Sequence, residues 1–235
     1  MGKNMDLSRI IQVYVIQLGV GGIFYLVIAF LILRRNRNRL NKIFSMYFIS
    51  IAIGTIINVI YVSLESIFII KVLNILTYYF FCFGQVFLLL FSLILIKSER
   101  VINTKKQLII IIVFAILLTG LFVIGLGFNA VTLNDKNKPV WDFLFVSYTL
   151  IVCGLYNFIP TLYFSAEIYK KFEDQQLKRK WKFFLLGIII YYFVWGGTTL
   201  SNHLNIPAFR MVWSLISLIA LISTYTIYYG VGKQL

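Results

Sequence analysis

Histidine is the one side-chain type that changes charge near neutral pH, and the chain has a single one, His203 in "TTLSNHLNIPAF". It could sense pH or bind a ligand, or it could be a surface or capping residue. A hydrolytic triad would need Ser201, His203 and Asp142 to meet, and nothing in the sequence positions them. Metal-dependent hydrolases need several converging His and carboxylate ligands. We therefore expect no enzyme, no metal and no cofactor.

Uncharged polar and aromatic residues are more suggestive, because they lie inside long apolar runs. A cavity lined by aromatic rings with a few polar groups is a common way to bind a small ligand. The same residues could instead form hydrogen bonds between packed helices. The candidate ligand-binding residues are Gln85, Tyr148, Asn157, Tyr191, Trp195, Asn202, His203 and Trp213.

The composition indicates a chain whose surroundings are lipid. Of its 235 residues, 60% are hydrophobic and 13% are charged, and the mean hydropathy is +0.90. The net charge of +14 could suggest nucleic-acid binding, but the basic residues form short clusters between apolar runs, so we expect no nucleic-acid partner. Cys82 and Cys153 lie within apolar runs and are expected to be buried thiols.

Seven uncharged runs, each long enough to cross a bilayer as a helix, divide the chain. Lipid cannot satisfy backbone hydrogen-bonding groups, so each run must be helical. The sequence predicts an all-α integral membrane protein, a single seven-transmembrane-helix bundle over residues 1–235, and it predicts a loop over "NAVTLNDKNKPVWD". We expect Trp141, Trp181 and Trp213 to lie at the membrane interfaces. The predicted spans are 10–33, 43–64, 72–96, 107–128, 143–166, 183–204 and 211–232.

The distribution of lysine and arginine predicts the orientation. Sixteen of them fall in the connections on one side of the predicted membrane and six on the other. Basic connections stay in the cytoplasm, so we expect the N-terminus outside, the C-terminus in the cytoplasm and the cell membrane as the location. In the fifth span, Pro160 is expected to kink the helix.

The longest basic connection is "EIYKKFEDQQLKRKWK", residues 167–182. We expect it to extend the fifth span as a helix, with ion pairs from Glu167 to Lys171 and from Asp174 to Lys178. Such a segment could contact a cytoplasmic signalling partner or anionic lipid headgroups. Its candidate contact residues are Lys170, Lys171, Lys178, Arg179 and Lys180.

Three stretches of the sequence resemble known proteins. They are "LILIKSERVINTKKQLIIII", "YKKFEDQQLKRKWKFFLLGI" and "NIPAFRMVWSLISLI". Together with "IYYGVGKQL" they are similar to a group of uncharacterised seven-transmembrane proteins of Asgard-type archaea, over most of the chain. More distantly, the layout resembles the seven-span sensor region of prokaryotic histidine kinases. That resemblance implies a receptor-like module, here without a kinase.

The sequence favours a sensor or receptor-like protein that binds a small neutral or lipidic ligand in the outer half of the bundle. Binding would shift the fifth and sixth spans and move residues 167–182, and a separate partner would detect the movement. A transporter or channel for an uncharged small solute is the alternative. The lipid bilayer is the expected environment, and the sequence leaves open whether the protein forms an oligomer.

Overall fold

The computed structural model describes Leu18 and residues 21–135 and 137–232, most of which are helical. The first described helix, α2 (Ile23–Arg35), precedes α3 (Arg39–Val62), α4 (Ile67–Lys97) and α5 (Thr104–Phe122), which continues as the π-helix η2 (Val123–Gly127). A hairpin leads to α6 (Phe143–Leu150), the π-helix η3 (Ile151–Phe158), α7 (Ile159–Lys171) and α8 (Gln175–Leu204). The last described elements are α9 (Pro207–Ile216), the short 3-10 turn η4 (Ser217–Ile219), α10 (Ala220–Ile227) and the π-helix η5 (Tyr228–Gly232).

Six helical segments in the described part of the chain are long and apolar enough to cross a membrane. The expected all-α membrane bundle is therefore confirmed, and the chain is a multi-pass membrane protein. α2 falls within the expected first span except for its last two residues, and residues 10–17, 19 and 20 of that span lie outside the described residues. Lys3, Arg9, Lys136 and Lys233, which contribute to the expected orientation, also lie outside them. The six segments are Arg39–Val62, Ile67–Lys97, Thr104–Gly127, Phe143–Lys171, Gln175–Leu204 and Pro207–Val231.

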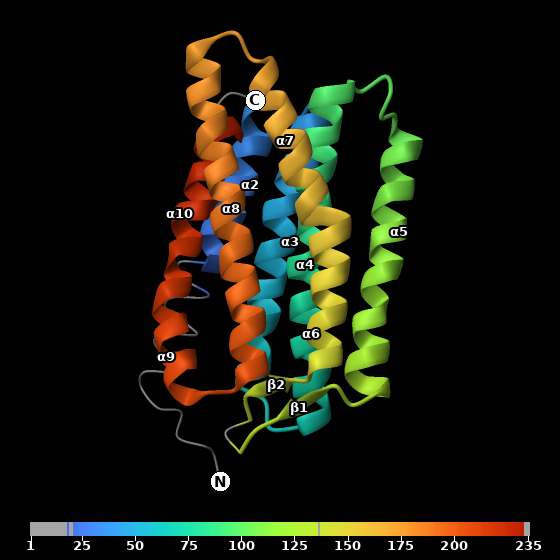
Figure 1. The fold of residues 1–235 in the computed structure, drawn as a ribbon, viewed down its shortest axis with the longest axis vertical. Coiled ribbons are helices and arrows are strands. Elements are labelled where there is room, and N and C mark those ends of the chain that lie inside the picture. Colours follow the sequence, from blue (N-terminus) through green and yellow to red (C-terminus); the bar gives the residue numbers. More distant parts are fainter. Residues whose placement is uncertain (1–17, 19–20, 136, 233–235) are drawn as a thin grey trace.

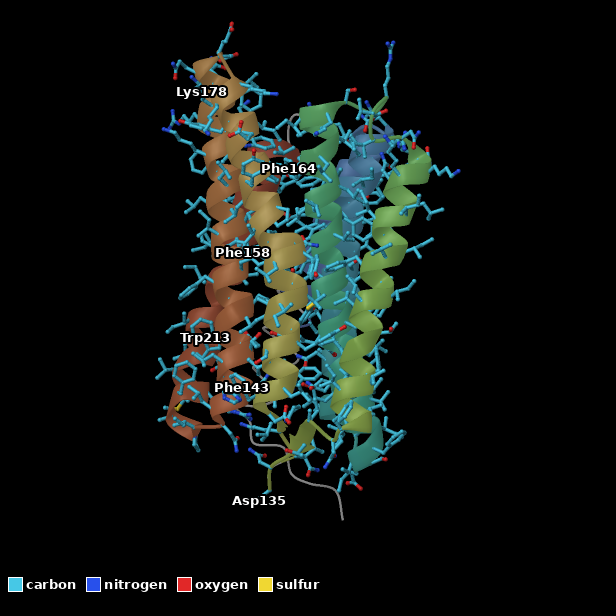
Figure 2. The ribbon with its side chains drawn as sticks, turned by 45° about the vertical axis from the view of Figure 1, so that its right-hand side comes forward. Asp135, Phe143, Phe158, Phe164, Lys178 and Trp213 are labelled. Atoms are coloured by element: carbon cyan, nitrogen blue, oxygen red, sulfur yellow. The ribbon has the colours of Figure 1, made fainter. Side chains whose placement is uncertain are left out.

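The helices run side by side along one long axis, with α5 at one edge of the bundle and α9 and α10 at the opposite edge (Figure 1). We call the end that carries the hairpin the hairpin end, and the end that carries residues 167–182 the basic end. Figure 2 shows Asp135 at the hairpin end and Lys178 at the basic end. The core is formed mainly where α3 packs along α4, and both helices are largely buried there.

The segment expected to be a loop folds as a two-stranded antiparallel hairpin, so that expectation is wrong. β1 (Val131–Leu133) pairs with β2 (Pro139–Trp141), with Val131 opposite Trp141. At the turn, Asn137 has a positive φ of 54°, a conformation that asparagine tolerates better than most residues. The hairpin lies at the end of the bundle below α6, beside the first part of α4 and the end of α8 (Figure 1).

The three tryptophans expected at the membrane interfaces are all buried, so their rings pack inside the protein and do not face lipid. Each indole N–H has an acceptor inside the bundle: the Asn74 side chain for Trp141, the Ser165 carbonyl for Trp181 and the Thr198 hydroxyl for Trp213. Because these acceptors satisfy the polar edge of the ring, its apolar area can pack inside the protein.

The basic segment is not one helical extension of the fifth span, so that expectation is wrong beyond Lys171. α7 ends there, Phe172 is extended, and the Asp174 carboxylate caps α8 by accepting from the Gln176 N–H at 2.6 Å. The Phe172 ring packs on Trp181, which favours a turn back onto the bundle. Glu167 pairs with Lys170 at 2.7 Å, where Lys171 was expected.

Candidate functional site along the polar face of α4

α4 carries a row of buried polar side chains along one face. Asn74, Tyr78, Gln85 and Ser92 are spaced by four, seven and seven residues, which places them on the same side of a helix. All four are buried. In a membrane-spanning helix, buried polar groups of this kind contact other helices or a ligand, since lipid offers them no hydrogen bonds.

At the hairpin end, the row meets the hairpin. The Asn74 side chain accepts from the Trp141 indole N–H at 3.1 Å and donates to the Tyr61 hydroxyl at 3.3 Å. Trp141 is only 1% exposed. Its ring lies edge-on to Tyr78, with centroids 4.4 Å apart, and packs on Phe145. Trp141 therefore fills space at the hairpin end, the end that the sequence predicts to be outside and where it suggested a ligand cavity.

Further hydrogen bonds hold the hairpin in place. His203 Nδ1 lies 3.0 Å from the Trp141 carbonyl oxygen. The Arg210 guanidinium donates to the Pro139 carbonyl at 2.6 Å and to the Ser201 carbonyl at 3.2 Å. His203 therefore has a structural partner on the hairpin backbone. Two side-chain bonds add to these contacts, from Lys71 to Asn129 at 2.8 Å and from Asn134 to Asn205 at 3.1 Å.

Two of the three side chains that a triad would require, Asp142 and His203, have other roles among the described residues. Asp142 caps α6 by accepting from the Phe145 N–H at 2.9 Å. His203 bonds the hairpin backbone, and no hydrogen bond joins the side chains of Ser201, His203 and Asp142 in the described part of the chain. The arrangement does not assemble a nucleophile with a base.

One turn further into the bundle, Tyr78 connects α4 to α8. Its hydroxyl donates to the Trp195 carbonyl at 3.1 Å and is hydrogen-bonded to the Thr199 hydroxyl. The Thr199 hydroxyl lies 3.0 Å from the same Trp195 carbonyl, so the two hydroxyl protons are shared among these three contacts. These shared bonds fix the spacing of the two helices in the hairpin-end half.

The centre of the bundle differs, because the Gln85 side chain is enclosed but not hydrogen-bonded. Gln85 is 0% exposed, and neither its amide nitrogen nor its amide oxygen has a hydrogen-bond partner among the described residues. Its backbone is well held. The Tyr191 hydroxyl donates to the Phe81 carbonyl at 2.9 Å, one turn earlier. The Asn157 amide, in the orientation that suits its neighbours, donates to the Gln85 carbonyl at 3.0 Å and accepts from the Val86 N–H at 3.0 Å.

Two more polar groups without partners lie in the same network. The Tyr47 hydroxyl and the Trp195 indole N–H are buried and unbonded within the described chain. Tyr47 packs edge-on to Tyr191, with centroids 5.5 Å apart. Tyr192 lies between, packing on Tyr191 and Trp195 and placing its hydroxyl 3.2 Å from the Asn157 side chain. Helices α3, α4 and α8 and the π-helix η3 all contribute to this centre.

The π-helix η3 brings Asn157 to α4. Pro160 has no N–H, so the Tyr156 carbonyl cannot form its normal helical bond. The structure accommodates this with the wider turns of η3, which run up to Phe158, and α7 then starts with Pro160 in its first turn. π-Helical turns inside longer helices are frequent at functional sites. Here Asn157, which is fully buried, contacts the backbone of α4.

At the basic end, the last member of the polar row, Ser92, is hydrogen-bonded again. The Ser92 hydroxyl is 3.0 Å from the Ser165 hydroxyl on α7. The Ser165 carbonyl accepts from the Trp181 indole N–H at 2.7 Å. α4, α7 and α8 are therefore tied together at this level, as they are at the hairpin end.

The predicted ligand-binding residues divide into groups. Gln85, Asn157, Tyr191 and Trp195 come together at the centre, as described above. Tyr148 donates to the Leu117 carbonyl on α5, away from this cluster. Trp213 packs against Gly197, where an added Cβ would overlap its ring, and against Phe193. Asn202 and His203 lie at the hairpin end, where the Asn202 carbonyl is 3.4 Å from an Arg210 nitrogen.

Sequence reasoning missed Tyr47, Asn74, Tyr78 and Trp141. The spacing of Asn74, Tyr78 and Ser92 relative to Gln85 was the available signal for the polar row. Tyr47 carried no such signal, because its position depends on how α3 packs on α4. Trp141 lies in a segment without regular periodicity, so its burial could not be read from neighbouring residues.

In the described residues, no group of three or more His, Cys, Asp and Glu side chains could hold a metal ion. Cys82 and Cys153 are buried free thiols. No protein-family model matches the chain, and no curated protein does either.

Proposed function

We propose that the protein is a sensor or receptor-like module of the cell membrane that binds a small neutral ligand at Gln85. It crosses the membrane seven times, with the N-terminus outside and the basic end in the cytoplasm. The resemblance to seven-span archaeal proteins and to kinase sensor regions supports this layout. The bias of lysine and arginine toward the basic end supports the orientation.

The observation that carries the proposal is the enclosed Gln85 amide. Leaving a buried polar group without a partner costs about 1–3 kcal/mol, and an amide has two donors and an acceptor to satisfy. Every other member of the polar row on α4 is hydrogen-bonded. Gln85 would supply both a donor and an acceptor to a ligand, with the Tyr47 hydroxyl and the Trp195 N–H as further partners. That combination suits a small neutral molecule that carries hydroxyl or amide groups.

Binding at Gln85 would reach the basic end through η3. Asn157 holds the α4 backbone at Gln85 and Val86, and η3 continues directly into α7. A ligand that prefers one arrangement of this turn would shift the population of that arrangement. α7 ends at the turn before α8, so the change would move Lys170, Lys171, Lys178, Arg179 and Lys180. A cytoplasmic partner contacting these residues would detect it.

A transporter or channel for an uncharged small solute is the second candidate, and the polar row on α4 favours it. The row extends from Asn74 near the hairpin end to Ser92 near the basic end. Trp141 and its bonds close the hairpin end, so transport would require the hairpin to move. Glycerol uptake into vesicles that contain the purified protein separates the two functions: uptake above that of empty vesicles supports transport.

The proposed function is tested by identifying small molecules that co-purify with the protein from native membranes. We expect a compound that is retained by the wild type and lost in Gln85→Met, whose side chain has a similar shape without the amide. Ser92→Ala, in the same helix, should retain it. If Gln85→Met retains the same compounds in the same amounts, Gln85 is not the binding site.

A further inference from the structure

A cleft at the basic end lies between α4, the α7–α8 turn, α8 and η5. Its volume is about 160 Å³. A space of this size is larger than a single water molecule needs, so it accepts a short stretch of a chain. Most of its lining is apolar. The lining residues are Phe91, Leu95, Phe172, Leu177, Lys180, Trp181, Gly230 and Val231.

Lys180 is the one charged residue among those lining residues. In the described part of the chain its ammonium forms no salt bridge. The ion pair of this region joins Lys170 to Glu167. Asp174 is engaged as the cap of α8. Lys178 and Arg179 precede Lys180 on the same helix, and Figure 2 shows Lys178 at this end of the molecule. Positive charge therefore borders an apolar cleft.

The walls of the cleft are fixed by close packing. At Gly230, an added Cβ would lie 2.6 Å from the backbone nitrogen of Phe184 and 2.8 Å from the Lys180 carbonyl, so η5 lies directly against α8. Trp181 is held by its bond to the Ser165 carbonyl. The cleft is thus bounded by backbone and by anchored rings, and Leu177 lies at its edge, 37% exposed.

We infer that this cleft binds one anionic phospholipid, with part of an acyl chain between Trp181 and Val231 and the phosphate next to Lys180. An apolar cleft with a cationic border, at the membrane level of a basic helix end, matches the two parts of such a lipid. The inference does not depend on Gln85 or on the proposed ligand, since the two sites share no residue.

A second hollow on the neighbouring face of α8 provides a matched control. It has a similar volume, about 160 Å³, but its lining residues Arg179, Lys182, Phe183 and Leu186 all lie on α8, so it is not walled by several elements as the cleft is. Lys182 lies over the Tyr169 ring, with its nitrogen 5.8 Å from the centroid. Lys180→Gln and Lys182→Gln remove the same charge two residues apart on different faces, so general attraction to an anionic membrane would change equally in both.

The test is native mass spectrometry of the full chain released from nanodiscs of equal parts phosphatidylglycerol and phosphatidylcholine. We expect the wild type to retain one phosphatidylglycerol in preference to phosphatidylcholine. Lys180→Gln should lower the retained fraction about fivefold to tenfold, which corresponds to losing one charge-assisted contact at a partly exposed site. Lys182→Gln should change it less than twofold. Equal losses in the two variants, or equal retention of the two lipids by the wild type, would overturn the inference.

Leu177→Trp tests the chain-binding half of the inference without changing any charge. Its ring should occupy the cleft and lower phosphatidylglycerol retention as strongly as Lys180→Gln. Thermal unfolding of each variant in detergent shows whether it is folded before the lipid measurement. Undiminished retention by folded Leu177→Trp protein would mean that no acyl chain enters the cleft, and the inference would be wrong.

Discussion

The hairpin end and the centre of the bundle treat most of their buried polar groups in opposite ways, with the unbonded Thr77 hydroxyl of α4 as an exception toward the hairpin end. At the hairpin end, Asn74, Trp141 and Arg210 all have hydrogen-bond partners, several of them backbone carbonyls. At the centre, the side chains of Gln85, Tyr47 and Trp195 are equally enclosed but have no partner among the described residues. Asn74 and Gln85 lie on the same helix, α4, so the difference depends on which side chains the neighbouring elements bring to each level.

This contrast separates polar groups that hold the fold from polar groups that are available to a ligand. Removing a bonded group leaves its former partner buried and unsatisfied, which costs stability. Removing an unbonded buried group takes away a desolvation penalty, which raises stability. Substitutions in the two regions should therefore change the free energy of unfolding in opposite directions.

The largest effect is expected for Trp141→Ala. The substitution removes a ring that contacts Tyr78 and Phe145 and leaves a cavity at the hairpin end. Large-to-small changes of this kind cost about 3–5 kcal/mol, and for a chain of this size each kcal/mol lowers the Tm by about 2–4 °C. Thermal unfolding in nanodiscs measures the change. A Tm within 2 °C of the wild type would show that the hairpin is not packed on the bundle.

A smaller loss is expected for Asn74→Leu. It removes the acceptor of the Trp141 indole N–H while keeping a side chain of similar size. We expect a loss of about 1–3 kcal/mol, the cost of one unsatisfied buried group. Trp141→Phe in the Asn74→Leu background removes the orphaned N–H and should recover part of the loss. If the double variant is no more stable than Asn74→Leu, the hydrogen bond is not the cause.

Arg210→Met should cost less again, because Arg210 is only half-buried. The variant loses the bonds to the Pro139 and Ser201 carbonyls but keeps an apolar stem. We expect a loss of about 1.5 kcal/mol, at the low end for hydrogen bonds to a charged group. Proteolysis of the hairpin should become faster as the hairpin loosens. Unchanged cleavage together with an unchanged Tm would show that Arg210 does not hold it.

Lys170→Gln should have no measurable effect on the Tm. Its partner is Glu167, the Lys170 side chain is exposed and the Glu167 side chain is partly exposed, and ion pairs in contact with solvent contribute little. The same thermal unfolding assay serves as the measurement. A clear fall in Tm would mean that the basic end depends on this pair, contrary to the packing around Phe172 and Trp181.

The helical fold could be predicted from the sequence because its cause is local. Apolar runs long enough to cross lipid must be helical, and charged clusters mark where those runs end. The hairpin at Val131–Trp141 could not be predicted, since its strands are three residues each and are stabilised by contacts with α4 and α8 and by the packing of Trp141 on Phe145 of α6. The turn at Phe172 depends on the distant ring of Trp181 and was missed for the same reason.

The candidate site was only partly predictable. Gln85 stood out as an amide inside an apolar run, and Asn157 and Tyr191 stood out similarly. These residues converge because the π-helix η3 brings Asn157 against α4. Pro160 indicates that the helix is interrupted, but it does not predict that Asn157 packs on the α4 backbone. His203 was singled out by its chemistry, but in the structure its Nδ1 contacts the Trp141 carbonyl of the hairpin.

The central claim is that the Gln85 amide serves a ligand and not the fold, and the most direct test compares Gln85→Met with Asn74→Leu. Both are unfolded thermally in nanodiscs, in protein washed free of co-purified small molecules. We predict that Gln85→Met raises the free energy of unfolding by about 1–3 kcal/mol, while Asn74→Leu lowers it by a similar amount. A fall in stability for Gln85→Met, parallel to that of Asn74→Leu, would contradict the account.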